Sequence, residues 1–129
     1  MNAEIWVHRE PSRSNAGLHV RPLDEAARGR LVEAVRLSPG ERRGFECTSR
    51  AEMRADRRLR VLSRLFLFGV PSGGIALSER DGAGRITMDP ASCETVADAL
   101  AGVFDHDERL LPAVMDGRES RLWIWWPLG

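Results

Sequence analysis

The chain has 129 residues, of which 43% are hydrophobic and 29% charged, a composition typical of a folded globular protein. This length predicts a single domain spanning residues 1–129 and excludes two ordinary domains. Because 19 basic residues balance 19 acidic ones, the molecule as a whole lacks the positive charge that attracts nucleic acid or an anionic membrane. All of the basic residues are arginine, which excludes Schiff-base catalysis and a P-loop lysine.

Export and membrane insertion are not expected. Residues 1–10 carry charge and lack the apolar stretch of a secretory signal, and the longest apolar run, residues 65–70, is too short to span a bilayer. The two cysteines, Cys47 and Cys93, form no disulfide or metal-binding pattern. We therefore expect a cytoplasmic protein that uses no metal or other cofactor.

The N-terminal third predicts two strands and a helix. Apolar and polar residues alternate from Glu4 to Arg9, as in a strand with one face on the core, and Leu18–Arg21 is expected to pair with it in a loose hairpin. Pro22-Leu23-Asp24 begins the clearest helix, and Ser38-Pro39-Gly40 ends it.

The middle of the chain is harder to interpret. A short extended piece is expected around Phe45 and Cys47, and Ser49 and Glu52 have the spacing of a capping box, which predicts a second helix ending near residues 60–62. Residues 65–68 are apolar at every position, which is typical of a central strand covered on both faces.

Turn-rich blocks separate two further strands, residues 75–80 and 85–89, which are expected to form a meander. A third helix is expected to start at Asp89-Pro90 or at Ser92 and to reach Phe104.

A shorter helical turn is predicted near Pro112, and residues 121–128 predict the last strand. Together the elements predict an α+β fold: one domain with a five- or six-stranded, mostly antiparallel sheet packed by two or three helices.

Tryptophan is the most unusual feature, since three of the four tryptophans lie within residues 123–126. If the two terminal strands are neighbours, Trp6, Trp123 and Trp125 share one sheet face with His8. Large aromatic rings are enriched where a protein anchors a partner. The alternative, favoured by the need to cover sheet surface, is that a helix covers this face and the rings belong to the core.

Charge is unevenly distributed along the chain. Eight arginines and three acids lie between residues 42 and 64, whereas eight acids and two arginines lie between residues 79 and 108. This separation fits a protein partner better than nucleic acid, because the acidic half would repel a phosphate backbone. Arg54, Arg57 and Arg58 are therefore candidate partner-binding residues, and the alternative is a solvated helix face bridged to nearby acids.

The remaining clusters favour no catalytic or metal site. Four adjacent residues, Asp105-His106-Asp107-Glu108, cannot all face one ion, and the glycine-rich turns lack a phosphate-binding pattern. Cys93, close to a helix N-terminus, is expected to be a buried thiol, although an exposed one there would be reactive.

Three functions stay open at this level. The favoured one is a small non-enzymatic protein-binding or inhibitory domain, such as a bacterial immunity, antitoxin or anti-defence protein whose partner is a toxin or defence component. The second is a small-ligand-binding protein or enzyme whose site combines His8, Cys93, His106 or Glu108; a concave pocket holding two of these would support it. The third is nucleic-acid binding through residues 42–64, and a homodimer is also compatible with the sequence.

Overall fold

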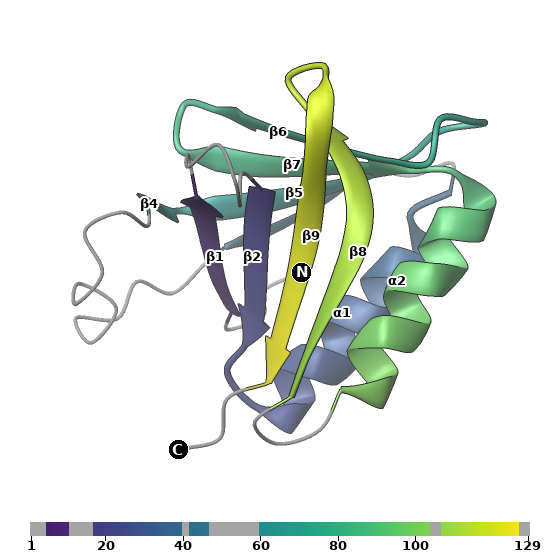
Figure 1. Cartoon of the computed structure of the whole chain (residues 1–129). Helices are drawn as coiled ribbons and strands as arrows, with labels where there is room; N and C mark the ends of the chain where they lie inside the picture. Colours follow the sequence, from purple (N-terminus) through teal and green to yellow (C-terminus); the bar gives the residue numbers. More distant parts are fainter. Residues whose placement is uncertain (1–4, 11–16, 40–41, 47–59, 104–106, 127–129) are drawn as a thin grey trace.

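The computed structural model describes residues 5–10, 17–39, 42–46, 60–103 and 107–126, and shows a curled sheet with two helices (Figure 1). The expected α+β fold is therefore confirmed. In chain order the elements are β1 (Ile5–Glu10), β2 (Gly17–Pro22), α1 (Glu25–Leu37), β3 (Arg42–Glu46), β4 (Arg60–Leu62), β5 (Arg64–Gly69), β6 (Ile75–Arg80), β7 (Ala83–Met88), α2 (Pro90–Gly102), β8 (Asp107–Met115) and β9 (Arg118–Trp126).

Within the described residues, nine strands pair in the order β3-β5-β7-β6-β8-β9-β2-β1-β4. The count exceeds the expected five or six partly because two short segments, β3 and β4, form the two ends of this order. The sheet is mixed: the pairs β2–β9, β5–β7 and β6–β8 are parallel, and the other five pairs are antiparallel.

The sheet curls back on itself, so that β5, β6 and β7 cross β1, β2 and β9 at a steep angle (Figure 1). Gly84 on β7 lies where the two halves meet. A Cβ atom there would stand 3.1 Å from Leu62 Cδ1 and 3.3 Å from Val7 Cγ1, so the missing side chain lets β7 pass close to β1 and β4. The concave, inner face of the curl forms the core.

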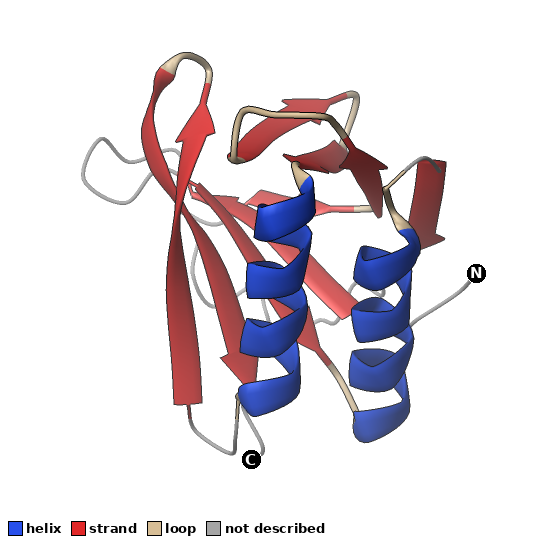
Figure 2. Cartoon of the chain, turned by 90° about the vertical axis from the view of Figure 1, so that its right-hand side faces the viewer, coloured by secondary structure: helices blue, strands red, loops and turns tan. Residues whose placement is uncertain are grey.

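The two helices lie side by side against the open side of the curl (Figure 2). α1 begins where the sequence predicts, and α2 begins at the first of its two expected starts. Each has an aspartate N-cap: Asp24 accepts the Ala27 N–H at 2.7 Å, and Asp89 accepts the Ser92 N–H at 2.8 Å. Their apolar stripes are buried against inward-facing residues of the sheet, and the buried helical residues are Ala27, Leu31, Ala34, Val35, Cys93, Val96, Ala97 and Leu100.

One predicted element is wrong. The residues around Pro112 form the middle of the nine-residue strand β8, whose inner-face residues are progressively more buried toward Met115, and not a helical turn. Strand β8 pairs with β6 only at Val114 and Met115, so the edge of β8 that faces β6 is open at Pro112. Proline, which has no N–H to donate, is tolerated at such an open edge.

The expected central strand and terminal neighbours also need correction. β5 is an interior strand, but only Leu65 and Leu67 are buried in the core, whereas Phe66 and Phe68 are half-buried on the outer face. The strands nearest the two termini, β1 and β9, are not adjacent, because β2 lies between them. The two strands expected at residues 75–80 and 85–89 do pair antiparallel, as β6 and β7, while β5 pairs with β7 in parallel.

Some expectations lie outside the described residues. These are Cys47, the helix expected from Ser49 to residue 60, and the end of the third helix at Phe104. Among the described helices, none is long and apolar enough to cross a membrane.

An ion pair closes the curl on its inner side. Arg9 at the end of β1 donates to Glu79 on β6 at 3.0 Å and to Asp116 in the β8–β9 turn at 3.2 Å. The Glu79 side chain is only 4% exposed, so the ion pair with Arg9 offsets part of the cost of burying its charge, whereas Asp116 is largely in solvent. Three segments distant in sequence are thus joined through one guanidinium.

We expect Glu79→Ala to lower the free energy of unfolding by about 2 kcal/mol, since Arg9 would lose its buried counter-charge but keep some access to water. Urea unfolding measures this loss. Glu94→Ala on the exposed side of α2 is the matched control and should change stability by less than about 0.5 kcal/mol. Equal effects of the two substitutions would contradict a closing role for Glu79.

Asp89 ties the start of α2 to the β5–β6 loop. Besides the Ser92 N–H, its carboxylate accepts the Gly74 N–H at 2.8 Å. These hydrogen bonds, those from the side chain and backbone of Ser92 first and that from Gly74 next, lower the pKa of Asp89.

Because the pKa of Asp89 is lower in the folded state, its carboxylate stabilises the fold above the ordinary aspartate pKa, and this contribution is lost as pH falls toward the lowered value. We expect Asp89→Asn to make thermal stability less sensitive to acid in this range. The test compares melting temperatures at neutral and strongly acid pH, and parallel curves for the two proteins would contradict the role of Asp89.

Candidate partner-binding face

Three aromatic side chains stack on the outer face of β2 and β9. The parallel register places His19 beside Trp123, with ring centroids 4.9 Å apart and planes only 8° apart. Trp125 continues the stack at 5.7 Å from Trp123 and 5.8 Å from His19. The three rings are nearly parallel and therefore act as one rigid unit.

A hydrogen bond fixes this unit. The Trp125 indole Nε1–H donates to His19 Nδ1 at 2.9 Å, so Nδ1 acts as an acceptor and a neutral imidazole holds its proton on Nε2. The guanidinium of Arg21 lies 5.7 Å from the centre of the Trp125 ring, within the range of a cation–π contact. Burial lowers the pKa of Arg21, but a guanidinium remains charged at neutral pH.

Gly17 allows β2 to begin directly beside β9. A Cβ atom at Gly17 would lie 2.1 Å from the carbonyl oxygen of Arg121, which is its partner in the register. Only glycine permits this approach, and the resulting register brings His19 opposite Trp123 two residues later. The site therefore depends on a residue that carries no side chain.

Neither helix covers these rings. On the same two strands, Leu18, Val20, Leu122 and Ile124 alternate with the aromatic residues and are buried in the core, where α1 and α2 pack. Trp123 and Trp125 are half-buried on the opposite face. The alternative in which a helix of the core covers the tryptophans therefore does not apply to α1 or α2.

Strand β8 extends the surface with apolar residues. In the β8–β9 register Leu110 stands opposite Trp123, and Glu108 stands opposite Trp125. Leu110 is 42% exposed and Val114, farther along the same side of β8, is 46% exposed. We call the surface formed by these outward residues the aromatic face; it comprises Arg21, Leu110, Val114, Trp123 and Trp125, together with His19, which is only 6% exposed beneath the stack.

The other partner-binding candidates are only partly placed. In the backbone register Trp6 pairs with Arg21 and His8 pairs with His19, so β1 continues the same row of strands, but the side chains of Trp6 and His8 lie outside the described part of the chain. The arginine candidates Arg54, Arg57 and Arg58 also lie outside the described residues.

The proposed members of an assembled active site do not come together where they are described. Cys93 is buried in the core, with its Sγ 3.3 Å from Ser38 Oγ, whereas Glu108 is exposed on β8. The side chain of His8 and the whole of His106 are outside the description. Among the described residues, no group of three or more histidine, cysteine, aspartate or glutamate side chains is placed to hold a metal ion.

His19 is the residue that sequence reasoning missed. It lies in the strand predicted over Leu18–Arg21, and Leu18 and Val20 on either side indicate that it faces away from the core, but nothing in the sequence gives it a role. The missing information was the parallel pairing with β9, which no local pattern reveals.

No protein-family model matches this chain, and neither a curated protein nor a solved structure matches it. The functional argument therefore rests on the geometry and chemistry described above.

We expect Trp125→Phe to cost about 1 kcal/mol more of unfolding free energy than Trp123→Phe, because it leaves His19 Nδ1 without its donor. Trp123 is the matched control: its Nε1 is buried with no acceptor among the described residues, so phenylalanine there removes a ring but no such hydrogen bond. Urea unfolding of both variants measures the difference, and equal losses would show that the Trp125–His19 bond contributes little.

Proposed function

We propose that the chain is a single non-enzymatic domain that binds another protein through the aromatic face. One observation carries this proposal: two half-buried tryptophans are stacked and hydrogen-bonded on a sheet face that neither α1 nor α2 covers. A small bacterial immunity, antitoxin or anti-defence protein, which acts by occupying a toxin or defence component, is the functional class that fits this mode of action.

The aromatic face has the features of an interface centre. Stacking and the hydrogen bond to His19 already restrict the rings, so little conformational entropy remains to be lost on binding. Leu110 and Val114 add exposed apolar surface beside them. Arg21 supplies a cation close to the stack, so we expect the partner to present an apolar surface with a carboxylate near Arg21.

Binding is favoured over catalysis by what surrounds the stack. An active site needs converging acid, base or nucleophilic groups in a concave pocket, whereas Glu108 lies in the open at the edge of the aromatic face. Cys93 is held in the core beside Ser38, so its thiol is far less accessible than a nucleophile requires.

The test introduces a charge at exposed apolar positions of the aromatic face and leaves the stacked rings unchanged. Leu110→Arg and Val114→Arg place a cation on exposed positions of β8, and Leu37→Arg on α1 is the matched control, because Leu37 is 44% exposed on the helical side. Partners captured from the source cells by the parent protein are identified by mass spectrometry, purified and titrated against all four proteins by calorimetry.

We expect a stoichiometric partner whose affinity falls at least tenfold with Leu110→Arg and stays within threefold with Leu37→Arg. A partner that binds the β8 variants as tightly as the parent would place the interface elsewhere. Sedimentation of the purified chain examines the homodimer alternative: a dimer dissociated by Leu110→Arg would assign the aromatic face to self-association and overturn the proposal.

A further inference from the structure

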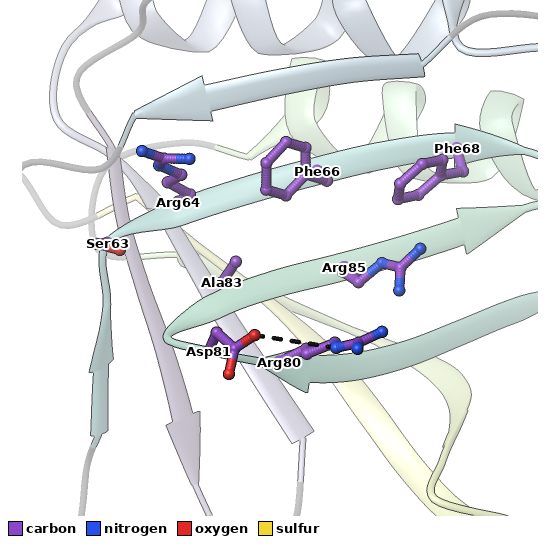
Figure 3. Close-up of a pocket in the computed structure, with 8 residues that line it drawn as sticks. All are labelled: Ser63, Arg64, Phe66, Phe68, Arg80, Asp81, Ala83 and Arg85. Atoms are coloured by element: carbon purple, nitrogen blue, oxygen red, sulfur yellow. Dashed lines mark ion pairs between the residues drawn. The ribbon is translucent and has the colours of Figure 1, made fainter.

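A basic, aromatic-floored cavity lies on the outer face of β5, β6 and β7, in a different part of the sheet from the aromatic face. Its volume is about 570 Å³, within the range of small-molecule sites. Figure 3 shows its side chains, which come from β5, from the β6–β7 hairpin and from the residue before β5. The lining residues are Ser63, Arg64, Phe66, Phe68, Arg80, Asp81, Ala83 and Arg85.

Two phenylalanine rings form the floor. Phe66 and Phe68 project from the same side of β5, with centroids 6.4 Å apart and planes inclined by 28°, and both are half-buried (Figure 3). Gly44 on β3 makes room for the first ring, since a Cβ atom there would stand 2.9 Å from Phe66 Cε1. A flat aromatic surface is thus available beside a glycine on the edge strand.

Three guanidinium groups surround this floor. Arg85 lies 4.8 Å from the centre of the Phe68 ring, while Arg64 and Arg80 lie toward the hairpin end of the cavity (Figure 3). Among the described residues, neither Arg64 nor Arg85 has a carboxylate within ion-pair distance. Arg80 lies 3.9 Å from Asp81, but both side chains are almost fully exposed, so this ion pair is weak. Among the described residues that line the cavity, three guanidinium groups therefore face the single carboxylate of Asp81.

We propose that this cavity binds a nucleotide, either free or as a unit of a single strand. Planar bases stack on aromatic side chains, and guanidinium groups bind phosphate oxygens in pairs. In this assignment the base lies on Phe66, the phosphate is held by Arg64 and Arg85, and Asp81 accepts a hydrogen bond from a ribose hydroxyl, a base amino group or the imide N–H of thymine. Three cations against one carboxylate suit a phosphate dianion.

The fold explains how a basic site arises in a neutral chain. Arg64 belongs to the basic stretch of the sequence, but Arg80 and Arg85 belong to the acidic one. Two acids of that stretch have partners away from the cavity: Glu79 points inward to Arg9, and Asp89 caps α2. Two arginines are thereby left on the outer face with Arg64.

The experiment titrates the isotopically labelled full chain with AMP and with a dT8 oligonucleotide, following backbone amide shifts at Gly44, Phe66 and Arg85. Phe66→Leu keeps an apolar side chain but removes the stacking surface, and Arg85→Ser removes a cation. Arg36→Ser on α1 is the matched control, since Arg36 is an exposed arginine on the helical side. Amide spectra without ligand confirm that each variant is folded.

We expect saturable shifts around the cavity with at least one of the two probes, weakened about tenfold by Phe66→Leu or Arg85→Ser and unchanged by Arg36→Ser. Binding of AMP alone assigns the site to free nucleotides, and much tighter binding of dT8 that weakens with salt assigns it to a single strand. The proposal is overturned if neither probe shifts these residues, or if inorganic phosphate or phosphotyrosine binds as tightly as AMP.

Discussion

The curl of the sheet is the constraint on which the other features depend. Because β7 passes close to β1 and β4 at Gly84, one face of every strand is turned toward a shared interior. Arg9 joins the two halves from β1 to Glu79 on β6, and the helices fill the open side of the curl. This arrangement buries most of the inner-face apolar residues of the described strands with two helices. It also leaves the convex face of the sheet outside the reach of α1 and α2, so neither helix shields the aromatic rings there from solvent.

The two candidate surfaces are built by the same physical means. In each, aromatic residues two positions apart project from one strand, Trp123 and Trp125 on β9 and Phe66 and Phe68 on β5. In each, a glycine on a neighbouring strand sets the approach: Gly17 allows β2 to meet β9, and Gly44 leaves room for the Phe66 ring. An arginine then lies near one ring, Arg21 near Trp125 and Arg85 near Phe68. The surfaces differ in what remains exposed, since apolar residues of β8 extend the first and the guanidinium groups of Arg64, Arg80 and Arg85 surround the second.

Much of the local structure could be predicted from the sequence, because it depends on neighbouring residues. The caps of α1 and α2 at Asp24 and Asp89 follow from residue type and position, and the strand β1 follows from its alternating residues. What could not be predicted is determined by pairing across the sheet. Pro112 suggests a helical turn in the sequence, but it lies in β8 where that strand is not paired with β6. His19 has no evident role in the sequence, and the parallel pairing of β2 with β9 is what brings it to Trp123. The same limit applies to the charge runs, because strand alternation separates Glu79 from Arg80 although they are adjacent in sequence.

The separation of Glu79 and Arg80 shows why charge per segment is a weak guide to function in a curled sheet. On β6, Glu79 points inward and pairs with Arg9, whereas Arg80 points outward and lines the cavity. A stretch that is acidic in sequence therefore contributes positive charge to the surface. A protein of zero formal charge can therefore present a cationic cavity and, on another part of the same convex face, an apolar surface with the cation of Arg21 beside it. The two surfaces use different strands and share no residue, so one can be altered by substitution while the other is left intact.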